Sequence, residues 1–518
     1  MPRPPSVPCC VMLLAALCMQ APPTILVAQQ TARSLALAFL PGPDGAAGSA
    51  MTLQQLQQAR QTQTNATQQP ELLRVNPAAE PSPALRYRLY PARWELRPGS
   101  ALLHFTRAHI LLHQFPNEKQ KEWQEWSRDE NDPSDQDLAA TLVSLDPVFD
   151  ELHELAQSED LTWDHRIRDV RGMAVYHYQL SDVHEVRPMV RLLSLKIRHQ
   201  LKKQDFDGAF SSISDGLRLA EFVGQGETLI QKVVGLAMAS IIRGSLQEAI
   251  ATPGCPNLYW ALASIPQPLI RVSDVVLWEV RNIPRVLPVL EEAETANWTD
   301  EEAIAKWASL VEDLDQLGGN GGFLDHRSRG VFAIASVTFV DVARERLLAN
   351  GVSEARLETL PPLQIVLLDA SRELRRIGDD VGKAHLLPVS LAKPLVERES
   401  EVFQRWQTKN RISSVPAMIA GILFPPGGQV LEAETRVFMA YNRLMTVEAL
   451  RMHAAEHAGE LPATLAQLNP VPAMLDPFTN QPFEYRIETH NDVRTIVLSA
   501  AGPLNYKPLQ ELRVQLVE

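Results

Sequence analysis

The middle of the chain carries apolar side chains at the spacing of an amphipathic helix. Between residues 85 and 425 such positions recur at intervals of three or four, which places successive side chains on one helix face. One example is the set Leu102, Phe105, His109, Leu112 and Phe115. The pattern predicts a helical body over residues 85–425.

The clearest part of this body predicts three consecutive helices. They end near Lys203, Phe222 and Ile250, and a turn at 205–208 separates the first from the second. Small residues occur where these helices would cross, at Ala209, Gly216 and Ala220. This arrangement resembles the tetratricopeptide unit, although no second copy follows at a period of about 34 residues. The sequence therefore predicts a mainly α fold, a helical-hairpin array or bundle.

Start and stop signals predict further helices. Asp146-Pro147 opens one, because proline favours the first helical position. Thr299 with Glu302 forms a capping box that opens another. A long helix over 328–350 is expected to end at Gly351, since glycine is the common residue just past a helix end.

The C-terminal part changes character after a helix predicted over 431–457. Apolar and polar side chains then alternate, with apolar ones at Phe483, Tyr485, Ile487, Ile496 and Leu498. Alternation of this kind is typical of half-buried strands and predicts a β-hairpin that turns at 490–492 and packs on the helix. We therefore expect residues 430–518 to form a small α+β module.

The first 28 residues have the pattern of an export signal. One basic side chain, Arg3, precedes the apolar run Cys9–Met19, and Ala28 is a workable cleavage site. The alternative, an uncleaved membrane anchor at Val11–Ala28, stays open, although this window is short for a spanning helix. We expect an exported protein of the periplasm or cell envelope, with residues 1–28 as its signal peptide.

Residues 29–84 are rich in glutamine and proline and contain few large apolar side chains. Such a composition cannot bury enough apolar area to offset the entropy lost on ordering, so this stretch is predicted to be a disordered tether. Beyond the signal peptide the chain has one cysteine, Cys255, which excludes an intrachain disulfide in the mature protein. We expect Cys255 to be a small buried residue.

Composition narrows the function without naming it. The 518 residues include 49 Lys+Arg and 62 Asp+Glu, which gives a formal net charge of −13 and a pI near 5.6. This balance argues against a nucleic-acid partner, because a binder needs a basic face to neutralise phosphates. The low glycine count of 25 also disfavours glycine-rich nucleotide-binding folds.

The sharpest chemical motif is an H-x-x-E-H string on a predicted helix. His453 and His457 lie four residues apart on one face and could hold zinc, with Glu456 as general base, as in inverzincin metallopeptidases. A third ligand is not apparent downstream, and histidines in a last helical turn are favoured by the helix dipole alone. We therefore expect a solvated helix end, assign no catalytic residue, metal or cofactor, and keep a zinc-dependent hydrolase as the alternative.

Other candidate residues are weaker. His109 and His113 share the same spacing, near His104, but no acidic residue lies between them. Trp163-Asp164-His165 places an acid beside a histidine without a serine or cysteine nucleophile at a strained turn. The acidic run 129–137 lacks the glycine of a calcium-binding loop. We expect a helix face and loops at these positions.

Six segments along the chain carry a family resemblance. They are ALRYRLYP (84–91), MVRLLSLKIRHQLKKQDFDGA (189–209), GQGETLI (224–230), PNLYWALASIPQPLI (256–270), PPLQIVLLDASRELR (361–375) and LPATLAQL…LDPFTNQPFEYR (461–486). Together they resemble a family of large, exported helical proteins of planctomycete bacteria. The resemblance implies export and a helical fold; the family brings no established activity and no catalytic residues to carry over.

The tail from Thr446 to Pro503 resembles the C-terminal part of type II secretion pseudopilins. There a helix runs into a P-x-x-L stretch, a DP turn and a strand pair, positions that Pro462, Leu465, Asp476-Pro477 and Tyr485 match here. The N-terminus departs from that family, because no prepilin cleavage motif precedes a long apolar stalk helix. The resemblance implies reuse of the small module.

The sequence thus predicts a non-catalytic scaffold or protein-interaction component of the bacterial cell envelope. Its expected partners are other envelope proteins, and contact with a membrane is expected only through an uncleaved N-terminal anchor. The alternatives are the zinc-dependent hydrolase at 453–457 and a pseudopilin-like component of a secretion system.

Overall fold

The structure is a computed structural model. It describes residues 71–127, 133–175, 178, 181–316, 338–409, 415–424, 427–490, 493–500 and 511–517. The predicted signal peptide at 1–28 lies outside these residues, as does the predicted tether up to residue 70. The protein is mainly α, with a small C-terminal sheet module, as the hydrophobic pattern predicts.

The first helices form where the periodicity predicts them. α4 (Ala101–Leu112) buries Phe105 and Leu112 and packs against α7 (Asp146–Gln157), which has proline in its first turn as expected. The other elements of this part are η1 (Arg93–Glu95), β2 (Arg97–Ser100), α5 (Asn117–Trp126), α6 (Asp135–Ser144), β3 (Ser158–Asp160), η2 (Ile167–Asp169) and η3 (Gly172–Val175). β2 and β3 pair in parallel.

Three long helices follow and confirm the strongest prediction. They are α8 (Ser181–Lys202), α9 (Phe206–Gly224) and α10 (Leu229–Ala251). A Cβ atom at Gly216 would meet Ile242 Cδ1 at 2.3 Å, so the absence of a side chain lets α9 and α10 approach closely. Small residues at this crossing therefore serve packing, as the sequence predicts.

α10 is also the one described helix that is long and apolar enough to cross a bilayer. More than half of its most apolar window is buried inside the fold, against α8, α9 and the C-terminal helix. Burial among other helices accounts for its composition as that of a core helix.

The chain then continues through shorter helices into a second group of long ones. These are α11 (Tyr259–Ala263), α12 (Ser273–Arg281), α13 (Ile283–Val286), α14 (Pro288–Thr295), α15 (Asp300–Gln316), α17 (Val340–Ala349), α18 (Glu354–Glu358), α19 (Pro362–Ala384), α20 (Val389–Lys409) and α21 (Val415–Leu423). The capping box of α15 forms as predicted, with Thr299 and Glu302 bonding each other's backbone amides. Of the long helix expected over 328–350, the described part is α17, and the rest lies outside the described residues.

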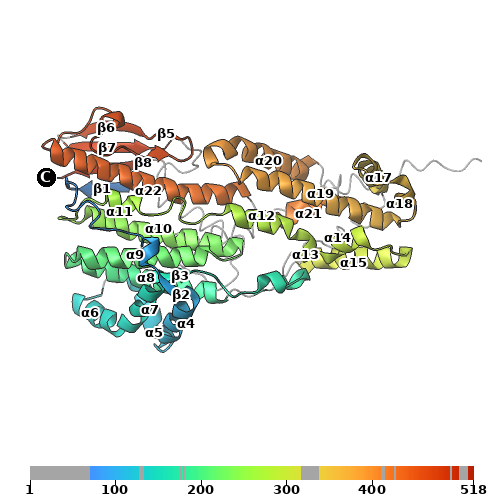
Figure 1. Ribbon diagram of the computed structural model, residues 1–518, viewed down its shortest axis with the longest axis horizontal. Helices are drawn as coiled ribbons and strands as arrows, with labels where there is room; N and C mark the ends of the chain where they lie inside the picture. Colours follow the sequence, from blue (N-terminus) through green and yellow to red (C-terminus); the bar gives the residue numbers. More distant parts are fainter. Residues whose placement is uncertain are drawn as a thin grey trace, which may run out of the picture.

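The described apolar side chains gather in two hydrophobic cores. The first core contains α4 to α11, the C-terminal helix and the sheet, with Leu217 and Leu498 among its buried members. The second core contains α13 to α15, α17 to α19 and α21, with Leu310 and Leu367 buried there. Figure 1 shows the two groups side by side along the long axis of the molecule. The predicted helical body thus packs around two centres.

The C-terminal module combines one long helix with a four-stranded sheet. α22 (Gly427–Glu456) lies along β6 (Glu484–His490), β7 (Val493–Ser499) and β8 (Glu511–Leu516), as Figure 1 shows. β6 and β7 pair antiparallel, with His490 opposite Val493, which confirms the predicted hairpin. Two further short strands, β4 (Leu475–Asp476) and β5 (Gln481–Pro482), flank the DP turn.

The fourth strand of the sheet corrects the predicted extent of the tether. β1 (Glu71–Val75) pairs in parallel with β8, so ordered chain begins well before residue 84. Leu73 and Val75 are buried in the first core. The composition of the whole stretch 29–84 hides these two apolar side chains, whose burial favours ordering of the strand. The two ends of the described chain meet at this strand pair.

Candidate functional site

The H-x-x-E-H string lies at the C-terminal end of α22. His453 is buried, whereas Glu456 and His457 are exposed. The two imidazole rings stack with their centroids 4.0 Å apart, and His457 Nδ1 donates to the His453 carbonyl oxygen at 2.8 Å. Burial and the neighbouring His457 lower the pKa of His453.

This geometry gives the zinc hypothesis little support. No group of three or more His, Cys, Asp or Glu side chains in the described part of the chain is placed to hold a metal ion. A zinc site needs at least three protein ligands that converge on one point. The string therefore presents two stacked rings and a solvated carboxylate at a helix end.

The other histidines considered as candidates make hydrogen bonds or ring contacts with neighbouring side chains and backbone. His104 Nδ1 lies 2.7 Å from the Glu151 carboxylate, and His113 Nδ1 donates to the His109 carbonyl oxygen at 3.0 Å. His165 stacks on Trp163, which in turn stacks on Phe222 at 4.3 Å between centroids. The acidic run 129–137 falls partly outside the described residues; Ser134 and Asp137 within it cap α6.

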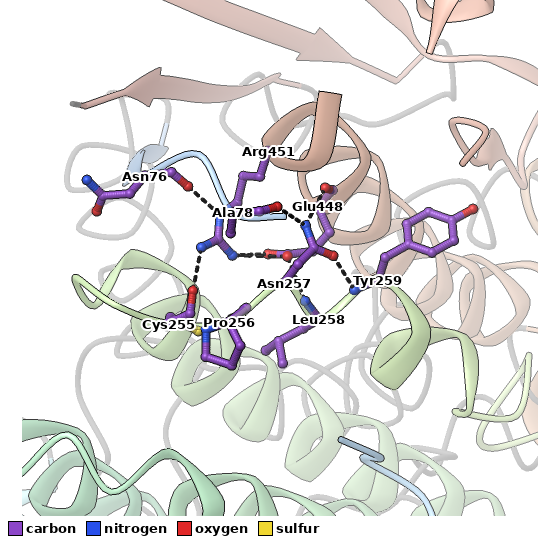
Figure 2. Close-up of polar contacts among 9 residues, drawn as sticks. All are labelled: Asn76, Ala78, Cys255, Pro256, Asn257, Leu258, Tyr259, Glu448 and Arg451. Carbon is purple, nitrogen blue, oxygen red and sulfur yellow. Dashed lines mark hydrogen bonds and ion pairs between the residues drawn. The ribbon is translucent and has the colours of Figure 1, made fainter. Parts of the chain in front are cut away.

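A polar site with more hydrogen bonds to other parts of the chain lies on α22, shortly before His453. Arg451 and Glu448 are both buried, with side-chain exposures of 1% and 0%. Arg451 Nη1 donates to Glu448 Oε1 at 2.7 Å, and its other nitrogens donate to the carbonyl oxygens of Asn76 and Cys255 at 2.7 and 2.8 Å. Figure 2 shows these contacts converging from three segments of the chain.

Asn257 completes this arrangement, which we call the Arg451 cluster. Its side-chain amide donates to the carbonyl oxygens of Glu448 at 2.8 Å and Ala78 at 3.1 Å, as Figure 2 shows. Glu448 Oε2 accepts from the Leu258 amide at 2.8 Å. The buried charges are thus paired and hydrogen-bonded, as burial requires, and they tie the segment after β1 and the loop before α11 to α22.

Cys255 joins the cluster through its carbonyl oxygen, and its thiol also lies beside Arg451. Its thiol donates to the Pro256 carbonyl oxygen, and burial raises the pKa of the thiol to about 12. A thiol of this kind stays protonated at neutral pH and is a poor nucleophile. The structure therefore confirms the expected small buried residue.

A second buried arginine holds the chain just before α4. Arg218 on α9 donates to Glu221 Oε2 at 2.5 Å, to the Tyr90 hydroxyl at 2.9 Å and to the carbonyl oxygens of Ala156 and Ser158. Tyr90 in turn donates to Glu221 Oε2 at 2.6 Å, and burial raises the pKa of its hydroxyl. This Arg218 cluster anchors Tyr90 in segment 85–97, which we call the strap.

The strap has an inner and an outer face. Its inner side chains are anchored, with Leu89 buried and the Tyr87 ring edge-on to Phe210 at 5.1 Å. Its outer side chains are exposed, and Trp94 is 83% and Leu85 65% accessible. The outer arginines are Arg86, Arg88, Arg93 and Arg97, each within ion-pair distance of an acidic side chain.

A half-exposed histidine, His153, pairs with a buried carboxylate. His153 Nδ1 on α7 lies 3.0 Å from the buried Asp215 carboxylate on α9. The hydrogen bond to Asp215 raises the pKa of His153, and burial raises the pKa of Asp215. The pair orients the ring.

Comparison with known proteins adds no assignment to these sites. None of the family models, curated proteins or solved structures compared with the chain matches it. Sequence reasoning missed the Arg451 and Arg218 clusters because their partners are mostly backbone carbonyls from distant segments. A signal for both exists: Glu448 and Arg451, like Arg218 and Glu221, stand three residues apart on one helix.

Proposed function

We propose that the protein is a non-catalytic scaffold or protein-interaction component of the bacterial cell envelope. The observation that carries the proposal is the outer face of the strap, where Trp94 stands 83% exposed beside Arg93. Tryptophan, tyrosine and arginine dominate the binding energy of protein interfaces. Covering an exposed ring of this size would remove apolar area from water and so favour binding of a partner.

The backing of the strap supports the same function. Arg218 and Glu221 hold the Tyr90 hydroxyl and Leu89 is buried, so the outer side chains project from an anchored segment. A preorganised surface loses less conformational entropy on binding than a flexible loop does. The buried polar chemistry of this region therefore serves to position an interaction surface.

The envelope location rests on the sequence of the N-terminal segment. Arg3 and the apolar run Cys9–Met19 favour export, whether the segment is cleaved near Ala28 or retained as an anchor. Sequencing the N-terminus of protein recovered from envelope fractions distinguishes these two forms. Recovery in the cytosolic fraction with an intact N-terminus would exclude both.

The interaction role is tested by capture of partners from envelope extracts. The wild-type chain should enrich a defined partner over an unrelated exported control, and Trp94→Ala should weaken this capture by about tenfold or more, as expected for an interface hot spot. Ile304→Ala is the matched control. Ile304 is an exposed apolar residue on α15, a helix whose opposite face packs in the second core. Equal capture by wild type and Trp94→Ala would remove the strap from the proposal.

One observation favours a second candidate, a pseudopilin-like component of a secretion system. α22 lies along the antiparallel strands β6 to β8 and leads into them through the DP turn, which is the order that the resembling module has. This candidate predicts co-purification with secretion machinery. The scaffold proposal requires no such association.

A further inference from the structure

α12 connects the two hydrophobic cores. Val272, at its N-terminal end, is buried in the first core, and Val280, near its C-terminal end, is buried in the second. On the second-core side α12 packs on α19, where a Cβ atom at Gly382 would meet Leu277 Cδ2 at 2.4 Å. This close packing fixes α12 to the second core, so its contacts with α10 and α22 form one of the links between the cores, beside the contact of α20 with α22.

Two carboxylates make that hold by capping helices other than their own. α12 has no side-chain cap from Val272, and the Val272 amide donates instead to Glu434 Oε2 of α22 at 2.6 Å. The amide of Leu229, the first residue of α10, donates to Glu279 Oε1 of α12 at 2.8 Å. α10 also packs against α22. The three helices α10, α12 and α22 are therefore linked in a closed ring, which we call the junction.

The junction carries more negative than positive charge. Glu434 faces Arg271, Lys232 of α10 and Asp274 of α12, and Glu279 meets the Leu229 amide. Both glutamates are partly buried, and Lys232 is almost fully buried. With all groups ionised, the three acids Glu279, Glu434 and Asp274 outnumber the two bases.

We propose that the junction is a proton-dependent clasp between the two cores, which closes when Glu279 and Glu434 take up protons and loosens when they lose them. Protonated carboxyl groups still accept from the helix amides through their carbonyl oxygens, and they no longer place two carboxylate charges in a poorly hydrated interface. The inference goes beyond the proposed function and does not depend on it.

The direction follows from proton linkage. Burial raises the pKa of Glu279 and of Glu434 from the ordinary 4.5 to about 7, against the lowering effect of the amide each one accepts from. The closed junction therefore binds more protons than an open, hydrated one. Its extra stability is fully present below pH 4.5 and is lost as the pH rises through about 7. Between about pH 5.5 and 8, each carboxylate should raise the opening constant by about 25-fold.

Amide hydrogen exchange of the full chain tests the clasp at those two pH values. After correction for intrinsic exchange, protection of amides at the start of α10 and in α12 should fall at least about tenfold from the lower to the higher pH. Amides in β7, at the centre of the sheet, should keep their protection. Glutamine mimics the uncharged carboxyl, so Glu279→Gln/Glu434→Gln should abolish the difference.

The matched control is Glu122→Gln, which removes an exposed carboxylate from α5 and should leave the difference intact. Equal protection of the wild-type junction at both pH values overturns the proposal, as does a pH dependence that persists in the double variant or extends equally to β7. If the double variant does not fold, Glu279→Gln and Glu434→Gln singly should each remove about half of the effect on a logarithmic scale.

Discussion

Two arginine–glutamate networks on the C-terminal module use the same chemistry at opposite levels of exposure. In the Arg451 cluster both side chains extend from α22 and are buried against the segment after β1 and the loop before α11. On the outer face of the sheet, Arg486 and Arg513 bridge Glu488 and Glu511 across β6 and β8, with Arg486 44% exposed. We call this second network the sheet ladder.

The two networks differ in what the loss of an arginine leaves behind. Arg451 is buried and donates to two backbone carbonyl oxygens, so its loss would remove their donor and leave the buried Glu448 carboxylate without its countercharge. The groups of the sheet ladder exchange protein contacts for water at little cost. The buried network therefore specifies which distant segments meet, whereas the exposed one adds a small, redundant contribution.

The largest effect is expected from Arg451→Met. The substitution keeps an apolar stem but strands the buried Glu448 charge, and it should lower the free energy of unfolding by about 3–5 kcal/mol. Urea denaturation followed by circular dichroism measures this loss. Glu448→Gln in the Arg451→Met background removes the stranded charge and should recover part of the stability. A loss below about 1 kcal/mol for Arg451→Met would show that the cluster does not stabilise the fold.

An ion pair at the second core is intermediate in exposure between these two networks. Asp369 is buried and accepts from Arg346 Nε at 3.1 Å, while Arg346 remains about one third exposed. Burial, only partly offset by Arg346, raises the pKa of Asp369 from 3.8 to about 6. Stability from this group is fully present below pH 3.8 and is lost as the pH rises through about 6.

Asp369→Asn should remove that pH dependence. Between about pH 4 and 7 the difference in unfolding free energy between the variant and wild type should change in the variant's favour, by on the order of 2 kcal/mol. Other carboxylates titrate alike in both proteins, so urea midpoints at the two pH values isolate Asp369. A constant difference would mean that Arg346 compensates the buried charge fully.

Much of the fold could be predicted because its determinants are local in sequence. The ends of α8, α9 and α10 follow from apolar periodicity, the turn at 205–208 and small crossing residues, and the hairpin of β6 and β7 follows from alternation. β1 was missed because five residues inside a glutamine- and proline-rich stretch become a strand only when β8 supplies the partner. Composition averages hide such a segment.

The site was less predictable than the fold for a physical reason. His453 and His457 are recognisable in the sequence as two possible zinc ligands. A zinc site needs a third ligand, and only the tertiary structure could supply it. Arg451 and Arg218 each have a glutamate three residues away, but most of their distant partners are carbonyl oxygens, which every residue carries, so no residue type marks the segments that they join. The exposure of Trp94 had no sequence signal, and only the structure reveals it.

The smallest effect is expected from Arg513→Gln in the sheet ladder. Arg513 Nη1 lies 2.9 Å from Glu488 Oε2, but Arg486 also bonds that carboxylate and holds the pKa of Glu488 below its ordinary value. Because Arg486 remains, the variant should lose at most about 1 kcal/mol, and the loss should shrink in high salt, where exposed pairs are screened. Urea midpoints at low and high ionic strength measure both. A loss as large as that of Arg451→Met, or one that salt leaves unchanged, would mean that exposure does not set the value of these ion pairs.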